Sequence, residues 1–552
     1  SGAREVNETN RGWVHDGEGC SMLKTVRGFR GAVTSPHHAA SHAGLNVLRE
    51  GGNALEAAIA TAAAIAVVYP HMNGLGGDNF WLIKPAGHLP IGIDACGAAA
   101  KGVNAATYRA AGHTAIPSRG GQAALTVAGA VAGWQEAYAL AKEWGGRLPL
   151  QRLLEEAIHY ARDGFAVTDS QYANTIKKCD ELRSVPGFSN TFLADDGVGA
   201  PMPGTLFQNP ALATTIERLV DSGLEAFYRG DLAHQIADEL SQAGSPLRFA
   251  DLDAMVARRV TPLQLNVNGH ALYNLPPPTQ GLASLMILGL FSRLEVASAE
   301  GFDFVHALVE ATKCAFRVRD REIGDPAYMK CDPRTFLESS LLDQMAGSID
   351  RGQAASWPDA GGDGDTVWFG AVDSDGNAVS CIQSLYWEFG SGVVLSGTGV
   401  TWQNRGISFS LDSTHHNELM PGRKPFHTIQ PALACLDDGR VMVYGTMGGD
   451  GQPQTQAALF CRYAMYGYPL QAAVTAPRWL LGRTWGESST NLKIESRFPD
   501  EVFTSLRGAG HDVQRVAAFD EMMGHAGALC HHPNGLIEGA SDPRSDGQVA
   551  TF

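Results

Sequence analysis

The stretch "GGDGDTVWFGAVDSDGNAVS", residues 361–380, changes from glycine and aspartate to alternating apolar residues at a single threonine, Thr366. After it come an extended run, the turn Asp375-Gly376-Asn377 and a second extended run, a pattern that is typical of a β-hairpin. A flexible segment therefore leads directly into a strand. A threonine at the start of a strand is usually explained by its β-propensity, but its hydroxyl also permits a chemical role.

A threonine hydroxyl is a weak nucleophile and needs a base to take its proton. When a threonine is the first residue of a chain, its own α-amine, which titrates near about pH 8, can be that base. For Thr366 this requires cleavage of the Asp365–Thr366 bond. A flexible segment that enters a rigid strand suits such self-cleavage, because the carbonyl must be twisted toward the hydroxyl. We therefore predict a processing site formed by Asp365 and Thr366.

The composition is that of a folded protein and not of a disordered one. The chain has 552 residues, of which 44% are hydrophobic and 18% are charged, enough for one large core or several domains. With 42 Lys+Arg and 58 Asp+Glu, the formal net charge is −16, which disfavours binding to nucleic acid or to anionic membranes. The longest apolar run, residues 57–68, is too short to span a bilayer and is predicted to be a buried helix.

The cysteines and the N-terminal residues bear on the cellular compartment. Nine cysteines are dispersed without a CxxC pair or a disulfide framework, which suits a reducing compartment. Residues 1–20 show neither a basic n-region nor an apolar h-region of a secretory signal, although a chain that begins at Ser1 leaves a removed leader open. We expect a cytoplasmic protein.

Local patterns predict a helical first part and a strand-rich second part. In residues 35–70, apolar positions recur at helical spacing and Asn53 with Glu56 matches a capping box, so two packed helices are expected. A glycine-rich turn precedes a strand at residues 80–83, and residues 120–345 are expected to form one mainly helical layered domain with a strand pair around residues 263–278. Residues 351–365 have the composition of a linker, and strands and turns are expected from residue 366 onward.

The sequence resembles the γ-glutamyltransferase family of N-terminal-nucleophile hydrolases over most of its length. Motifs that arrive in the family's order include "GNALEAAIATAAAIAVV" (52–68), "GLGGDNFWLI" (74–83), "NLPPPTQG" (274–281), "TVWFGAVDSDGNAVS" (366–380), "PGRKPFHTIQPAL" (421–433) and "GTMGGDGQPQ" (445–454). The resemblance implies an α+β fold, a four-layer αββα sandwich, made as a precursor that cuts itself in two. The large subunit would be residues 1–365 and the small subunit residues 366–552.

The resemblance also implies the catalytic residues. Thr366 matches the family's nucleophile, and Gly448 with Gly449 matches the glycine pair whose amides form the oxyanion hole. Each such backbone donor contributes about 10²- to 10³-fold in rate. Ser384 stands at the family's second threonine and keeps a hydroxyl that could bond the α-amine or the side chain of Thr366. A purely structural role of Ser384 as a polar strand residue stays open.

The residues with which the family holds the α-carboxylate and α-ammonium of glutamate are largely replaced. Cys96 stands where the family has an arginine, and Tyr386 stands where it has an asparagine. The family's acidic residues are replaced at positions 407 and 408, while a new cation, Arg405, precedes them. The charge of the predicted pocket is therefore reversed, and we expect Arg405 to bind a substrate carboxylate, with a surface ion pair as the alternative.

Further differences indicate a small pocket. The family's serine pair becomes His427 and Thr428, which still form hydrogen bonds but are bulkier. Next to Tyr386, Trp387 adds an aromatic wall. His71 and Asn73, in the glycine-rich turn, are expected to close the pocket from the large subunit.

A site that binds an anion and lacks a ligand for an ammonium group should accept a short carboxylate-bearing amide without an α-amino group, because burying an unpaired charge is costly. Within the family, "YPHMNGLGGDNFWLI" (69–83) and "PFHTIQPAL" (425–433) resemble the oxamate amidohydrolase branch, which hydrolyses oxamate to oxalate and ammonia in purine-nitrogen salvage. The alternatives are a glutaryl-amide or cephalosporin acylase, a γ-glutamyl hydrolase or transferase, and an inactive homologue that only binds.

No cofactor or metal is expected. "THHNELMPG" (414–422) contains His415 and His416, but adjacent histidines point in different directions and no further ligand follows at metal-site spacing. The glycine-rich segments fit no phosphate-binding motif. The expected partners are a small amide substrate and the second subunit, in a heterodimer after cleavage, and a dimer of heterodimers stays open.

Overall fold

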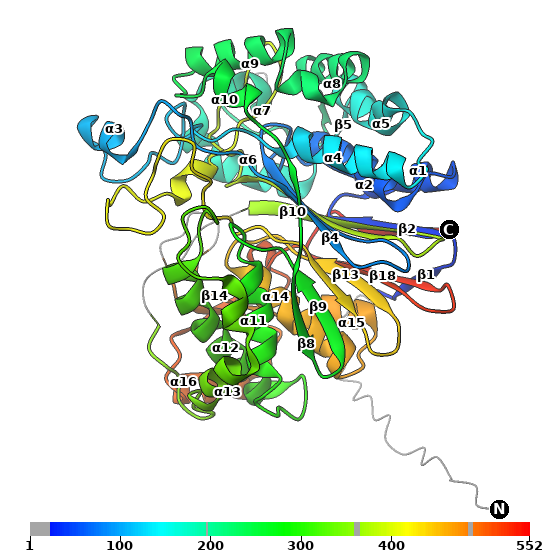
Figure 1. Ribbon diagram of the computed structural model, residues 1–552, viewed down its shortest axis with the longest axis vertical. Helices are drawn as coiled ribbons and strands as arrows, with labels where there is room; N and C mark the ends of the chain where they lie inside the picture. Colours follow the sequence, from blue (N-terminus) through cyan, green and yellow to red (C-terminus); the bar gives the residue numbers. More distant parts are fainter. Residues whose placement is uncertain (1–22, 195–196, 358–364, 484–488) are drawn as a thin grey trace, which may run out of the picture.

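The computed structural model describes residues 23–194, 197–357, 365–483 and 489–552, and Figure 1 shows two stacked sheets between two layers of helices. The described residues form two seven-stranded sheets and two small ones. The N-terminal segment on which the expectation about a leader rests (1–22), and residues 358–364 of the expected linker, lie outside the described residues.

The sheet that carries Thr366 lies under the upper helical layer of Figure 1. All its printed pairings are antiparallel, and its strands are ordered β19-β2-β10-β11-β3-β4-β7. Their bounds in that order are Gln548–Thr551, Gly31–Ser35, Asp365–Asp373, Ala378–Tyr386, Asp78–Lys84, Ile91–Ala95 and Arg258–Val260. The expected hairpin is β10 and β11, and the strand expected at residues 80–83 is the longer β3.

The facing sheet is also antiparallel throughout, with strand order β1-β18-β17-β13-β12-β9-β8. Its strands in that order are Val26–Gly28, Ile537–Ser541, Gly527–His531, Val441–Gly445, Ala432–Cys435, His270–Asn274 and Leu263–Val267. The expected strand pair in residues 263–278 is β8 and β9. Apolar side chains from both sheets, among them Phe80, Trp368 and Leu433, form the core between them.

Helices from the first half of the chain cover the outer face of the Thr366 sheet (Figure 1). Helix α2 is buried along its whole length and begins with the capping box of Asn53 and Glu56, as predicted. The layer comprises α1 His38–Arg49, α2 Ala54–Val68, α4 Ala130–Glu143, α5 Leu150–Asp163, α6 Asp169–Leu182, α7 Phe188–Phe192, α8 Pro210–Ser222, α9 Asp231–Gln242 and α10 Phe249–Asp253, with α3 Ala105–Ala110 to one side and the small sheet β5 Phe165–Ala166 and β6 Leu206–Phe207.

A second helical layer covers the outer face of the other sheet (Figure 1). It consists of α11 Gly281–Phe291, α12 Gly301–Glu322, α13 Ser339–Gly347, α14 Gly451–Phe460, α15 Leu470–Thr475 and α16 Asp500–Gly508, together with the three-stranded sheet of β14 Trp479–Leu481, β15 Leu492–Glu495 and β16 Val513–Val516.

The expectation of a single helical domain in residues 120–345 is wrong. Helices α4–α10 belong to the upper hydrophobic cluster, whereas α11–α13 belong to the lower one. The strands β7–β9 lie between these groups in the chain and carry it from one outer layer to the other, because each sheet buries its outer face against its own helices. In the part of the chain that the structure describes, no helix has the length and apolarity needed to cross a membrane.

Candidate active site

Three polar residues form a row across neighbouring strands at one end of the first sheet. Thr366 lies on β10, next to β11, and the Cα of Ser384 on β11 pairs with that of Asp78 on β3. The row ends just beyond β4, where the amide of Gly97 donates to Asp78 Oδ1 at 3.1 Å. The sheet register therefore brings Thr366, Ser384 and Asp78 together from segments far apart in the sequence.

The hydroxyl of Thr366 is fully buried and lies in a polar environment. Thr366 Oγ donates to Ser384 Oγ at 3.2 Å, and Gln452 Nε2 donates to Thr366 Oγ at 3.4 Å. Ser384 Oγ in turn accepts the amide of Tyr386 at 2.8 Å. The structure thus places Ser384 beside Thr366, in the position that its predicted role requires.

The backbone is irregular next to Thr366. Asp365 pairs with Tyr386 and Val367 pairs with Gln383, so the register shifts at Thr366, which faces Ser384 and Leu385 together. Tyr386 has a φ of +83°, a conformation that is costly for a residue with a Cβ. Bulges and strained residues of this kind recur beside active sites, where they redirect side chains.

The glycine pair lies in the turn between β13 and α14. Gly448 and Gly449 have φ values of +107° and +50°, and the carbonyl of Gly449 accepts the amide of Gln452 at 3.2 Å. Gln452 therefore links this turn to Thr366. Within the described residues, the amides of Gly448 and Gly449 donate to no acceptor. Two unused amides in a turn that is linked to the Thr366 hydroxyl through Gln452 are suited to form an oxyanion hole.

A buried arginine on α12 supports the turn between β13 and α14. Arg319 on α12 donates to Asp450 Oδ1 at 2.6 Å and to Gln280 Oε1 at 2.8 Å. Gln280 Nε2 donates to the carbonyl oxygen of Gly449 at 2.9 Å and also to that of Thr428. These contacts hold the carbonyl of Gly449 and the side chain of Asp450, and so anchor the turn that carries the glycine pair.

Arg405 is buried, with 1% of its surface exposed, and the described residues offer it no carboxylate within ion-pair distance. Its Nη1 donates to Thr428 Oγ1 at 3.2 Å, and its guanidinium stacks on the ring of Tyr386 with Cζ 3.6 Å from the centroid. Its Nε and Nη2 have no acceptor among the described residues. Burial lowers the pKa of Arg405 to about 10, so it remains a cation at neutral pH. The alternative of a surface ion pair is wrong.

His427 and Asp78 adjoin Arg405 and are also buried. His427 Nε2 lies 3.5 Å from Asp78 Oδ2, and the imidazole packs edge-on against Phe80, with ring centroids 5.0 Å apart. Burial, assisted by Arg405, lowers the pKa of His427 well below its ordinary value, so the ring is neutral. Burial raises the pKa of Asp78 to about 7, against the opposing effect of the Gly97 amide.

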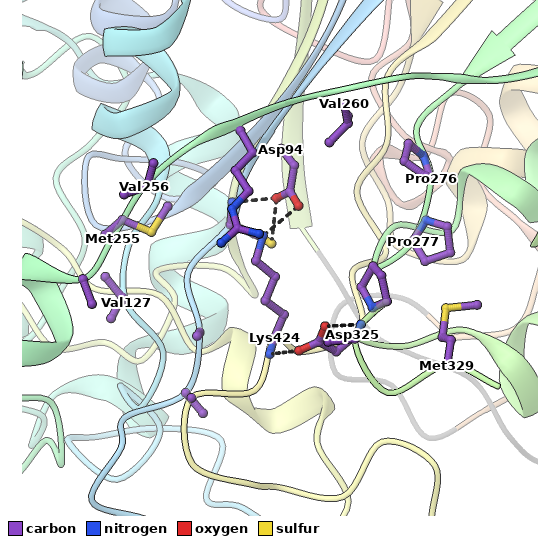
Figure 2. Close-up of a pocket in the computed structure, with 18 of the residues that line it drawn as sticks. Asp94, Val127, Met255, Val256, Val260, Pro276, Pro277, Asp325, Met329 and Lys424 are labelled. Carbon is purple, nitrogen blue, oxygen red and sulfur yellow. Dashed lines mark hydrogen bonds and ion pairs between the residues drawn. The ribbon is translucent and has the colours of Figure 1, made fainter. Parts of the chain in front are cut away.

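Cys96 interacts electrostatically with Asp78 and Arg405 and is one of the residues that line a cavity of about 700 Å³. Its thiol donates to Asp94 Oδ1 at 3.1 Å, and burial raises its pKa well above the ordinary value. Figure 2 shows Lys424 between Asp94 and Asp325, and Lys424 Nζ donates to Asp94 Oδ2 at 2.7 Å. Cys96 therefore provides no cation in place of the family's arginine.

Asn73 and His71 do not join Arg405, His427 and Thr428. The amide of Asn73 donates to the carbonyls of Ile65 and Tyr69 and accepts from Gln383, so it fastens the end of α2 to β11. The ring of His71 bonds to Ser170 at 3.0 Å and packs on Tyr69. Their expected role in closing the pocket has no support in these contacts.

The sequence analysis missed Asp78, Gln452, Gln280 and Arg319. Asp78 was visible as an acid between a glycine turn and an apolar strand, and Gln452 as a polar residue directly after the glycine pair. Nothing local marked Gln280 or Arg319, because their role depends on contacts between separate segments. His415 and His416 lie in a loop, where their rings bond to the backbone of Asn417 and Ile323.

Two stacked antiparallel sheets between helical layers, with a threonine at the start of a central strand, define the fold of the N-terminal-nucleophile hydrolases. Residues 40–552 match the family model described as gamma-glutamyltranspeptidase, and the chain belongs to this family. The predicted family and the predicted four-layer αββα sandwich are confirmed.

Two relatives of known sequence and one solved structure are similar to this chain over nearly its whole length. It is 55% identical to the oxamate amidohydrolase proenzyme of Klebsiella pneumoniae, over 95% of this chain and 98% of that protein. It is 40% identical to a glutathione hydrolase-like proenzyme of Bacillus subtilis, over 95% of this chain and 99% of that protein. The crystal structure of cephalosporin acylase from Bacillus halodurans superposes with a TM-score of 0.88 at 31% identity, over 99% of both chains.

Proposed function

We propose that this chain is a self-processing amidohydrolase whose nucleophile is Thr366 and whose substrate is a short carboxylate-bearing amide such as oxamate. The observation that carries the proposal is Arg405, a buried guanidinium whose Nε and Nη2 have no acceptor among the described residues. Neighbouring N–H groups of a guanidinium match the two oxygens of a carboxylate. The 55% identity to an oxamate amidohydrolase proenzyme supports the same substrate.

Processing starts with the attack of Thr366 Oγ on the carbonyl carbon of Asp365. The Asp365–Thr366 peptide bond breaks, an ester forms on Oγ, and the nitrogen of Thr366 becomes a free amine; water then hydrolyses the ester. The register shift at Thr366 supports this step, because an irregular backbone lets the hydroxyl approach a carbonyl outside the regular ladder. The products are a large subunit of residues 1–365 and a small subunit of residues 366–552.

In the catalytic cycle, the freed α-amine takes the proton of Thr366 Oγ, which attacks the amide carbonyl of the substrate. The amides of Gly448 and Gly449 donate to the oxyanion of the tetrahedral intermediate. The C–N bond then breaks, the α-amine returns its proton to the departing ammonia, and water hydrolyses the remaining ester. Ser384 orients Thr366 Oγ through the hydrogen bond of 3.2 Å. With oxamate the products are oxalate and ammonia.

The proposal extends to the metabolic role, the cellular location and the assembly of the protein. Release of ammonia from oxamate suits purine-nitrogen salvage, and the dispersed cysteines support a cytoplasmic location. The assembly is a heterodimer of the two subunits, and a dimer of such heterodimers is a further proposal.

A cephalosporin-type acylase is the second candidate, favoured by the TM-score of 0.88 to an acylase structure. Such enzymes accept larger acyl groups than an oxo-acid amide. Here the ring of Tyr386 lies against Arg405, with Cζ 3.6 Å from its centroid, and takes up space beside the anion-binding group. The small substrate is therefore favoured.

Mass spectrometry under denaturing conditions tests the processing step. We expect two fragments that meet between Asp365 and Thr366, and one intact chain for Thr366→Ala. One intact mass in a fully active preparation contradicts the mechanism. The conservative variant Thr366→Ser keeps a hydroxyl and should still be cleaved, which distinguishes loss of chemistry from misfolding.

The substrate class is tested by comparing turnover of oxamate, glutaryl-p-nitroanilide and γ-glutamyl-p-nitroanilide by the cleaved enzyme. We expect ammonia from oxamate and the highest kcat/KM for that substrate. A preference for the glutaryl compound would favour the acylase, and a preference for the γ-glutamyl compound would favour a glutathione-hydrolase activity.

A further inference from the structure

Asp78 is a buried acid in the same row as Thr366 and Ser384, and the proposed cycle does not use it. Its Oδ1 accepts the amides of Gly97 and Gly129 at 3.1 and 2.9 Å. Its Oδ2 meets no donor at hydrogen-bond geometry among the described residues and lies 3.5 Å from His427 Nε2, while the side chain of Gln403 also acts on the carboxyl and lowers its pKa. Only 1% of the residue is exposed. A carboxylate held in this way has one satisfied oxygen and one oxygen that faces the substrate-binding group.

The charged and titratable groups that face Asp78 come from several elements. Arg405 and Cys96 interact with it electrostatically, His427 faces its Oδ2, and Tyr228 approaches from the helical layer. Burial keeps the Cys96 thiol and the Tyr228 phenol protonated by raising their pKa values, and keeps His427 neutral by lowering its pKa. Arg405 is therefore the one permanent charge among these groups at neutral pH.

Lys424 is a second cation in this region, and its charge is matched by Asp94. It acts on His427 and Cys96, but its ammonium donates to Asp94 at 2.7 Å. The local balance thus depends on Arg405 and Asp78. With Asp78 ionised, their charges cancel, and a bound carboxylate would leave one uncompensated negative charge in a buried site. With Asp78 protonated, the negative charge of the bound carboxylate and the positive charge of Arg405 cancel instead.

We propose that Asp78 takes up a proton when a carboxylate binds to Arg405, so that the site binds a monoanionic substrate together with one proton. This inference rests on the proposed function, because it takes the Arg405 group as the substrate's carboxylate site. An uncompensated buried charge costs several kcal/mol, whereas protonating a carboxyl near its pKa costs little. The pKa of Asp78 is raised by burial to about 7, so both forms are accessible near neutral pH.

The consequence is a pH-dependent affinity for small carboxylates. Below about pH 7 Asp78 is already protonated and the affinity is nearly constant. Above that pH the dissociation constant rises by up to about tenfold per pH unit, because each binding event must take up one proton. Once protonated, Asp78 Oδ2 also has an O–H that can donate to the bound anion or to His427.

The probe is pyruvate, a monoanion in which a methyl group replaces the amide nitrogen of oxamate, so that it binds without reacting. Isothermal titration calorimetry of the cleaved wild-type enzyme in buffers of different ionisation enthalpy measures the protons taken up. We expect close to one proton per pyruvate at pH 8.5 and much less than one at pH 6. Binding without proton uptake at pH 8.5 would overturn the inference and leave the proposed function standing.

The variant Asp78→Asn tests whether Asp78 is the group that takes up the proton when pyruvate binds. Asparagine keeps an oxygen for the Gly97 and Gly129 amides but has no ionisable group, so proton uptake should disappear and the pyruvate affinity should no longer fall above pH 7. At pH 8.5 the variant should bind pyruvate about tenfold or more tightly than the wild type does. The matched control Asp373→Asn removes another buried carboxyl whose pKa is raised by burial, at the other end of β10, and should keep the wild-type pH dependence.

Two other results have distinct meanings. The free α-amine of Thr366 also titrates near about pH 8, so proton uptake that persists in Asp78→Asn assigns the proton to that amine and overturns the inference. If neither pyruvate nor oxamate binds to the wild-type enzyme at any pH, the carboxylate site itself fails and the proposed function fails with it.

Discussion

Two buried polar clusters in this molecule contain similar residues and differ in how completely those residues are paired. On α12, Glu310 Oε1 accepts Lys313 Nζ at 2.7 Å, and His306 bonds to His511 at 2.8 Å between ring nitrogens. In the candidate active site, Arg405, His427 and Asp78 together present several polar atoms without a partner among the described residues. Both clusters are buried.

The side chains of the α12 cluster bind the backbone of residues 350–355, which follow α13. His306 bonds to the carbonyl of Asp350 at 2.9 Å, Lys313 donates to the carbonyl of Ala355 at 2.7 Å, and Glu310 accepts the amide of Ala355 at 3.1 Å. His306, Glu310 and Lys313 recur at i, i+4 and i+7, so one helix face anchors the segment that leads toward the processing site.

His306, Glu310 and His511 also lie within the spacing of metal ligands, with their ligand atoms inside 4.8 Å of one another. Those atoms already bond to each other, to Lys313 and to the backbone. The comparison teaches that a buried charge with matched partners is costly to disrupt, whereas a buried charge with unused donors indicates a missing ligand.

The largest effect is expected from Arg405→Met. If the unused donors bind the substrate carboxylate, kcat/KM for oxamate should fall by on the order of 10²- to 10³-fold, mainly through KM. Steady-state kinetics checks this. Arg462→Met is the matched control, because Arg462 is also fully buried with a pKa lowered by burial to about 10, but donates to the carbonyl of Pro477. An unchanged KM in Arg405→Met would remove Arg405 from the site.

Lys313→Met tests the paired cluster. It leaves Glu310 buried without its cation and should lower the free energy of unfolding by about 3 kcal/mol, with little change in the KM of the folded enzyme. Urea denaturation measures the loss. Because the double variant Glu310→Gln/Lys313→Met removes both charges, it should be more stable than Lys313→Met alone. A large change in KM would show that this cluster also serves the substrate.

Ser384→Ala should have a smaller effect, confined to the chemical step. The variant loses the hydrogen bond to Thr366 Oγ, and one such bond is worth about 1 kcal/mol, so kcat should fall by about five- to tenfold with KM nearly unchanged. Single-turnover kinetics on the cleaved enzyme isolates this step. Ser380→Ala is the control, because Ser380 lies on the same strand but bonds to Trp368. Equal rates in both variants would assign Ser384 a structural role.

The last effect concerns acid stability. Burial lowers the pKa of His511 from 6.5 to about 3, so the folded state keeps this ring neutral where the unfolded state binds a proton. Stability is therefore complete above pH 6.5 and falls as the pH drops toward 3, by at most about 1.4 kcal/mol per pH unit for this group. His511→Gln should flatten the decline in urea denaturation between pH 6 and 4, whereas His159→Gln, an exposed control, should not.

The hairpin and the buried helix could be predicted because they depend on local patterns, whereas the four layers were predicted only from the resemblance to the family. Thr366 and the turn at residues 375–377 mark β10 and β11, and the Asn53 capping box marks α2. The division of the helices between two faces was not predictable, since periodicity reports which side of a helix is buried and not which sheet covers it.

In the candidate site, the residues that lie in recognisable sequence motifs were predicted. The residues whose role depends on how the strands pair were not. Thr366 and Ser384 follow from the family's motifs and Arg405 from a departure from them, and the structure places all three in one region. Asp78 was missed because its importance comes from pairing with Ser384 across strands and from burial beside Arg405. Neither property is visible in a single segment.

The strand order of the two large sheets has a consequence for the cleaved enzyme. In one sheet β2 lies between β19 and β10, and in the other β1 and β9 flank β18, β17, β13 and β12, so strands from both sides of residue 365 alternate. Cutting the chain there makes two polypeptides but not two domains, since neither fragment contains all the strands of either large sheet. The fragments should therefore melt in a single transition, remain together through dilution, and fold only in each other's presence.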